Sequence, residues 1–202
     1  MTPELKDRIT ANLAAFPRLA VERPDLRRAA VAILLCPWRG AAAYVLTRRA
    51  LTMRRGAGNY ALPGGGLEPG EDAPMAAIRE TAEELGIALP THAALGQLDD
   101  FVTLSGFAVT PVVLWSSAPV KFRPDPVEVH AAWRVPIAEL DHPGAPRREK
   151  PLFGGEPILR MRARGRWINP PTAAWLYQFR EVALHGRWTR VASLAQPAWT
   201  AR

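Results

Sequence analysis

The chain has 202 residues, of which 48% are hydrophobic, and its formal net charge at pH 7 is +7. This composition is enough for one ordinary core, so a single domain is expected. No apolar run approaches the ~18 residues of a membrane span and no signal-peptide pattern opens the chain, so we expect a cytoplasmic protein without membrane contact.

The first part of the chain predicts a helical extension and then two strands. Residues 1–27 begin with an amphipathic pattern typical of a short helix. Residues 29–37 and 41–47 predict strands joined by a short turn, and residues 48–61 predict a loop. Cys36 is the single cysteine, which excludes an internal disulfide. With no basic partner evident nearby, we expect it to be a buried, unreactive thiol.

Residues 73–85 predict a helix with clear start and stop signals. Asp72 suits the N-cap, Pro74 lies in the first turn where its missing N–H costs nothing, and Gly86 suits a left-handed C-terminal position. We expect the helix to pack on a sheet through an apolar stripe, which consists of Ile78, Ala82 and Leu85.

The remainder alternates strands and loops and ends in a helix. The predicted strands are residues 93–101, 107–115, 129–135 and 158–163, with a turn of helix at 136–140, loops at 118–128 and 142–155, and a helix at 172–185. Helices on both faces of a mixed sheet are therefore expected, as an α/β fold. We divide the chain into an N-terminal helical extension (1–27), one domain (28–191) and a loosely ordered tail (192–202).

Three carboxylates of the predicted helix share one face. Glu80, Glu83 and Glu84 occupy positions i, i+3 and i+4, where like charges repel, and Arg79 is the nearest local cation. Such carboxylate oxygens suit Mg²⁺ or Mn²⁺ acting on phosphate. A run of glutamates is more often a plain solvated face. The spacing of these residues relative to Gly65, Glu71 and Gly86 is not explained by that simpler interpretation.

The segment from Gly65 to Ile87 resembles the Nudix box, G-x5-E-x7-R-E-U-x-E-E-x-G-U, where U is a bulky aliphatic residue. Every specified position matches except that Thr81 replaces an aliphatic residue. The resemblance implies a Nudix-type α/β/α sandwich with a mixed central sheet and a catalytic loop-helix. It also implies a hydrolase of a diphosphate bond.

The resemblance also implies roles for the matched residues. The metal ligands would be Glu80, Glu83 and Glu84, together with the carbonyl of Gly65, and the cofactor would be Mg²⁺ or Mn²⁺. Glu71 would pair with Arg79 and order the junction between loop and helix. Glu80 is also a candidate to hold or deprotonate the attacking water.

Residues 45–65 are similar to a second signature, that of the coenzyme A diphosphatase branch, L-L-T-x-R-S-x3-R-x3-G-x3-F-P-G-G. The spacing is kept without a gap, although Val45 conservatively replaces the first leucine, Ala50 replaces the serine and Leu62 replaces the phenylalanine. The resemblance implies substrate contacts from these matched positions, which are Thr47, Arg49, Arg54, Gly58 and Gly64. Arg49 and Arg54, which we expect on the loop before the box, could hold phosphate oxygens bidentately, although they could also be solvated loop residues without a ligand.

Glu128 is a candidate distal carboxylate for water activation. It lies in a proline-rich loop outside the predicted helix, where a mobile carboxylate could close over substrate. An exposed glutamate without a role is an equally good interpretation. Asp99, Asp100 and Asp125 are weaker candidates for the same role.

The expected partner is a small nucleotide that resembles coenzyme A. A positive net charge suits a polyanionic substrate, whereas the basic residues are scattered as pairs, which argues against nucleic acid. Hydrolysis of another nucleoside diphosphate derivative, such as ADP-ribose, NADH or an RNA cap, stays open, as does a nucleotide-sensing module without turnover. Seven tryptophans and an apolar C-terminal helix are compatible with a homodimer or simply with the core.

Overall fold

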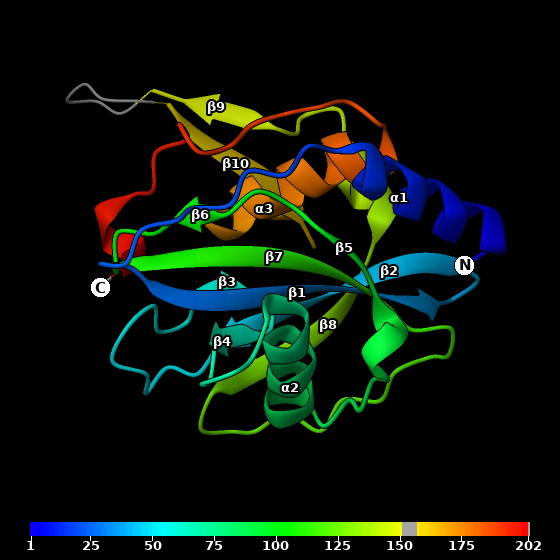
Figure 1. Cartoon of the computed structure of the whole chain (residues 1–202), viewed down its shortest axis with the longest axis horizontal. Helices are drawn as coiled ribbons and strands as arrows, with labels where there is room; N and C mark the ends of the chain where they lie inside the picture. The colour runs from blue at the N-terminus through cyan, green and yellow to red at the C-terminus, as the bar shows by residue number, and fades with distance from the viewer. Residues whose placement is uncertain (151–156, 202) are drawn as a thin grey trace.

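The computed structural model describes residues 1–150 and 157–201. An eight-stranded mixed sheet lies between two layers of helices. Figure 1 shows α2 (Ala73–Leu85) below the sheet, with α1 (Pro3–Ala15) and α3 (Thr172–Gln178) above it. This arrangement confirms the expected α/β/α sandwich.

The centre of the sheet is a parallel pair with antiparallel neighbours. β1 (Arg27–Trp38) runs parallel to β7 (Phe107–Trp115) and antiparallel to β2 (Ala41–Arg49), and β2 pairs with β8 (Val129–Pro136). The middle of β1 is an unbroken run of buried residues. Helices cover both of its faces, so alternation with polar residues is not required. The predicted strands of this region are confirmed.

Four short strands complete the main sheet; they are β3 (Tyr60–Ala61), β4 (Gly64–Gly66), β5 (Ala94–Gln97) and β6 (Phe101–Val102). The prediction of one strand over residues 93–101 was wrong, because buried Asp99 and Asp100 separate β5 from β6. Their carboxylates accept hydrogen bonds from the backbone N–H groups of Leu19 and Val21, respectively. They fasten the segment after α1 to the sheet.

A three-stranded antiparallel sheet follows, in the order β11 (Arg166–Ile168), β10 (Ile158–Ala163) and β9 (Arg147–Glu149). β9 lies within the stretch predicted as loop, and residues 151–155 of that stretch lie outside the described residues. The predicted helix 172–185 begins as α3 and continues as a π-helical segment, η3 (Phe179–Leu184). The short 3₁₀ helices are η1 (Thr91–Ala93), η2 (Ile137–Asp141) and η4 (Ala198–Ala201).

Helix α2 begins and ends as predicted. The Asp72 carboxylate accepts a hydrogen bond from the N–H of Met75, and Gly86 adopts the left-handed conformation at φ 65°. The predicted apolar stripe was only partly right. The buried face includes Ala73, Ala77, Thr81 and Leu85, whereas Ile78 and Ala82 are half-buried. Thr81 is tolerated in the core because its hydroxyl donates to the carbonyl of Ala77.

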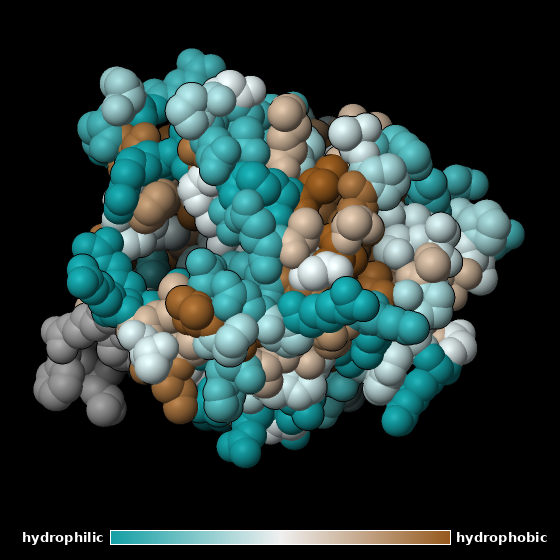
Figure 2. Space-filling model, turned by 90° about the horizontal axis from the view of Figure 1, so that it is seen from below, coloured by the Kyte–Doolittle hydropathy of each residue, from teal (hydrophilic) through white to brown (hydrophobic). Residues whose placement is uncertain are grey.

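The core has one part on each face of the main sheet. Cys36 is fully buried in the part beside α2, as expected, and burial raises the pKa of its thiol. Figure 2 views the molecule from the α2 side, where the surface is mostly hydrophilic with an apolar patch right of centre. Among the described residues, no helix has the length and apolar character needed to cross a membrane.

Candidate active site

Arg79 joins the loop before α2 to the carboxylates on the helix. Its Nε lies 2.8 Å from Glu71 Oε1, and its Nη2 donates to the carbonyl of Gly66 at 2.9 Å. Its Nη1 lies 3.0 Å from Glu80 Oε1 and 2.9 Å from Glu83 Oε2. The hydrogen bond to Glu71 is the main cause that raises the pKa of Arg79 and lowers that of Glu71. The predicted Glu71–Arg79 pair is therefore present in the structure.

Glu84 is a carboxylate buried at the centre of this group. Its side chain is nearly inaccessible, and Oε1 accepts a weak hydrogen bond of 3.4 Å from the N–H of Gly64. The pKa of Glu84 is raised to about 8, mainly by burial and also by the charges of Glu80 and Glu128, while the hydrogen bond from Gly64 and the charge of Arg49 act in the opposite direction. Burial also raises the pKa of Glu80, despite the opposing ion pair with Arg79.

The turn at Gly65 and the Glu80 carboxylate lie in close contact. A Cβ at position 65 would lie 2.3 Å from Glu80 Oε1 and 2.6 Å from its carboxyl carbon. No side chain fits between the backbone of this turn and the carboxylate. Glycine at this position therefore lets a backbone carbonyl and a carboxylate approach the same small volume.

The carboxylates around the glycine turn have the chemistry needed to bind a divalent cation. They offer hard oxygen donors, and the mutual repulsion of Glu80, Glu84 and Glu128 is what a cation would relieve. No set of three His, Cys, Asp or Glu side chains is arranged as a ready metal site in the part of the chain described. Arg79 holds the carboxylates of Glu80 and Glu83, so these two would have to exchange partners on binding.

Glu84→Gln is expected to stabilise the metal-free protein at pH 8. The folded-state pKa of Glu84 lies above the ordinary value of 4.5, so folding takes up a proton and the wild-type loses stability as pH rises from about 4.5 to 8. Glutamine removes this dependence and the cost of burying an ill-satisfied charge, about 1–3 kcal/mol. The measurement is the unfolding free energy in EDTA at pH 5 and pH 8; a gain no larger at pH 8 than at pH 5 would contradict it.

A cavity of about 530 Å³ opens beside the glycine turn. Its walls include Ala29, Val31 and Val109 of the central strands and the turn residues Gly64, Gly65 and Gly66. The C-terminal third supplies the other wall, through Trp167, Asn169, Pro170, Pro171, Thr172 and Trp175. Asn169 Oδ1 and Trp175 Nε1 are buried without a hydrogen-bond partner within the described residues. The sequence assigned no role to this part of the chain, since no local motif marks it.

The structure brings some of the predicted substrate-binding residues to the cavity and leaves others away from it. Arg49, Gly58 and Gly64 line the cavity. Thr47 is buried in β2, and its hydroxyl donates to the carbonyl of Ala61, so it braces the β2–β3 pair instead. Arg54 is not among the lining residues, whereas its neighbour Arg55, which the sequence did not single out, is.

Among the acidic loop residues, Glu128 lies near the carboxylates of α2. It is exposed, and its charge raises the pKa values of both Glu80 and Glu84. Asp99 and Asp100 are instead occupied structurally, by ion pairs of 2.7 Å to Arg190 and 2.6 Å to Arg18. The Asp125 carboxylate accepts a hydrogen bond from the N–H of Val127, and its charge is not among those that act on Glu80 or Glu84, so Glu128 is the best placed of the candidates for a distal carboxylate.

Comparison with known proteins places these features in a family. A family model described as "NUDIX domain" matches residues 26–153. A relative from Escherichia coli (strain SMS-3-5 / SECEC), named "Uncharacterized Nudix hydrolase NudL", is 33% identical over 129 residues, or 63% of this chain and 67% of the relative. A relative of the same name from Photorhabdus laumondii is 36% identical over 96 residues, or 47% of this chain and 51% of the relative. The matches thus span about half to two thirds of these relatives.

The fold is also found among solved structures. The crystal structure of a NUDIX hydrolase from Alicyclobacillus acidocaldarius aligns with a TM-score of 0.54 at 18% identity, covering 82% of this chain and 95% of that chain. At this level of identity the likeness concerns the fold alone. It agrees with the sandwich and the mixed sheet described above.

Proposed function

The chain belongs to the Nudix family of hydrolases acting on phosphorus anhydrides, and we propose that it cleaves the diphosphate of coenzyme A or an acyl derivative. The products are 3′,5′-ADP and (acyl-)4′-phosphopantetheine. One observation carries the proposal: residues of the upstream coenzyme A-type signature line the same cavity as the glycine turn of the box. These residues are Arg49, Gly58 and Gly64.

In the proposed reaction, water attacks one phosphorus of the diphosphate. A new P–O bond forms, the anhydride P–O bond breaks, and the leaving phosphate carries away the electron pair. Glu80 or Glu128 accepts the proton of the water, since both lie among the carboxylates around the glycine turn. Arg79 keeps the loop and helix in register through Glu71 and the carbonyl of Gly66.

Glu80, Glu83 and Glu84, with the carbonyl of Gly65, are the residues that would hold Mg²⁺ or Mn²⁺. When bound, the cation neutralises the diphosphate and lowers the pKa of bound water. Two observations support this assignment: these residues supply hard oxygen ligands, and the negative charges around Glu84 repel one another. Arg49 binds phosphate oxygens in the cavity, where the guanidinium can form paired hydrogen bonds.

The test is hydrolysis of coenzyme A beside ADP-ribose, NADH and capped RNA, with Mg²⁺ or Mn²⁺, and identification of products by mass spectrometry. Metal-dependent release of 3′,5′-ADP and phosphopantetheine is expected. Preferred cleavage of another diphosphate would remove the coenzyme A assignment and keep the enzyme class. Absence of turnover with tight nucleotide binding would favour a sensing module.

The same assay separates Arg49, at the end of β2, from Arg54 in the loop that follows. Arg49→Ala is expected to raise KM for coenzyme A about tenfold, because it removes a charged contact inside the cavity. Arg54→Ala is expected to raise KM less, since Arg54 is not among the lining residues. An equal or larger effect of Arg54→Ala would show that the loop takes another conformation when substrate is bound.

A further inference from the structure

Basic residues are concentrated in the three-stranded sheet. The stretch 147–166 contains seven Lys or Arg residues and two Glu. In the strand register, Arg160 lies opposite Arg147 and Arg162 lies opposite Trp167. Cross-strand partners share a face and side chains two apart on a strand share a face, so these four side chains lie together on the outward face of the sheet. The inward face of β10 belongs to the core.

This face carries more positive charge than its own carboxylate can balance. Glu149 pairs with Arg147 at 3.0 Å and with Arg160 at 3.2 Å. Within the described part of the chain, Arg162 forms no ion pair with a carboxylate. Three guanidinium groups thus face one carboxylate, which leaves a site attractive to an anion.

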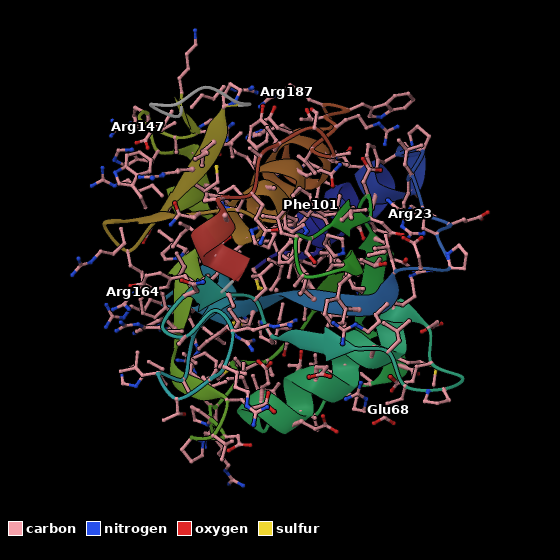
Figure 3. All side chains as sticks on the ribbon, turned by 90° about the vertical axis from the view of Figure 1, so that its left-hand side faces the viewer. Arg23, Glu68, Phe101, Arg147, Arg164 and Arg187 are labelled. Atoms are coloured by element: carbon pink, nitrogen blue, oxygen red, sulfur yellow. The ribbon has the colours of Figure 1, made fainter. Side chains whose placement is uncertain are left out.

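Trp167 connects this basic face with the cavity. Its side chain lines the cavity, and the guanidinium carbons of Arg147 and Arg162 lie 5.6 and 5.7 Å from its ring centre. Figure 3 shows Arg147 on the same side of the molecule as Arg164 at the far end of β10. The same cavity is lined by Arg49 and the glycine turn. A bound molecule can therefore meet positive charge at the turn and again beyond Trp167.

We propose that Arg162, assisted by Arg147 and Arg160, binds a phosphomonoester that the substrate carries apart from its diphosphate. Trp167 would pack against the nucleoside between the two anionic groups. This inference rests on the proposed function and adds to it a reason for preferring a 3′-phosphorylated nucleotide. A phosphomonoester carries a charge of about −1.5 to −2 at pH 7, and arginine recognises it through paired N–H donors.

The experiment measures binding of 3′,5′-ADP and of AMP by titration calorimetry. Neither nucleotide contains a diphosphate bond, so the measurement is independent of turnover. The wild-type protein is expected to bind 3′,5′-ADP about tenfold more tightly than AMP, a ratio typical of one charged contact. Arg162→Gln should make the two affinities nearly equal by weakening 3′,5′-ADP alone, and Arg162→Lys should restore part of the ratio.

Arg148→Gln is the matched control. Arg148 lies in the same strand as Arg147 and is exposed, but it faces the other side because side chains alternate. The Arg148→Gln substitution removes one charge from the same sheet and should leave the affinity ratio of 3′,5′-ADP to AMP unchanged. The inference would be overturned if the wild-type protein bound 3′,5′-ADP no more tightly than AMP. It would also be overturned if Arg162→Gln kept the affinity ratio, or if Arg148→Gln reduced the ratio as much as Arg162→Gln.

Hydrolysis of coenzyme A and dephospho-coenzyme A distinguishes the two proposals. If both hold, Arg162→Gln raises KM for coenzyme A about tenfold and leaves KM for dephospho-coenzyme A nearly unchanged. Absence of cleavage of both compounds, with the calorimetric preference intact, would reject the proposed reaction and keep the phosphate site. Cleavage of both compounds with equal effects of the variant would reject the site and keep the reaction.

Discussion

Replacing Glu83 with glutamine is expected to lower kcat at least about a hundredfold while the protein stays folded. Its side chain is 59% exposed on α2, and its pairing with Arg79 in this position adds little to stability. Loss of the Glu83 charge should therefore affect metal binding and catalysis while changing the stability of the fold very little. The measurement is kcat for the preferred diphosphate at saturating Mg²⁺, with the unfolding temperature of the same sample.

Glu68→Gln is the control for that experiment. Glu68 is an exposed carboxylate on the loop before α2, and its backbone N–H donates to Glu71. As Figure 3 shows, it lies at the end of the molecule that holds α2. Removing its charge should leave kcat close to wild type. Full activity of Glu83→Gln, or an equal loss in both variants, would remove Glu83 from the proposed metal ligands.

Alanine at two adjacent glycines of the turn is expected to have different effects: Gly64→Ala should lower the stability of the fold, and Gly65→Ala should lower the activity. In Gly64→Ala the new Cβ would lie 2.2 Å from the carbonyl oxygen of Ala30 and 2.7 Å from Val31 Cα. Both are backbone atoms of β1 and cannot move aside without breaking the β1–β4 pairing. We expect a loss of stability of about 3 kcal/mol or more, the upper part of the range for overpacking.

Gly65→Ala should instead preserve the fold and reduce activity. Its Cβ meets the end of the Glu80 side chain, which can rotate away at low cost. That rotation removes Glu80 from the turn, so kcat should fall about tenfold to a hundredfold. Urea unfolding and kcat measured on both variants test this pair. A Gly65→Ala protein that is as unstable as Gly64→Ala, or fully active, would contradict it.

Helix α2 shows how much local sequence can specify. Asp72 and Gly86 end the helix through contacts within a few residues, and the spacing of Glu80, Glu83 and Glu84 follows from the helical repeat alone. The Glu71–Arg79 pair, eight residues apart, was likewise predictable because the matched motif includes both partners. These features depend on backbone geometry that the neighbouring residues determine.

The same helix marks where local patterns fail. Thr81 belongs to the buried face although the predicted stripe was Ile78, Ala82 and Leu85, since the side that faces β1 depends on how the helix is rotated against the sheet. The predicted strand 93–101 is broken for a similar reason. Asp100 binds Arg18, which lies 82 residues away in sequence, and no local pattern records that contact.

The sequence by itself determined the family box, the carboxylate face of α2 and its caps, because each depends on contacts between residues close along the chain. Only the tertiary structure decided which residues form the cavity. In the structure Arg55 lines the cavity and Arg54 does not, and Thr47 is buried in β2. Trp167 lines the same cavity as the glycine turn. The position of Trp167 follows from the packing of the C-terminal third against the sheet, and that of Thr47 from the pairing of β2 with β3. Contacts between separate segments of this kind leave no periodic signature in the sequence.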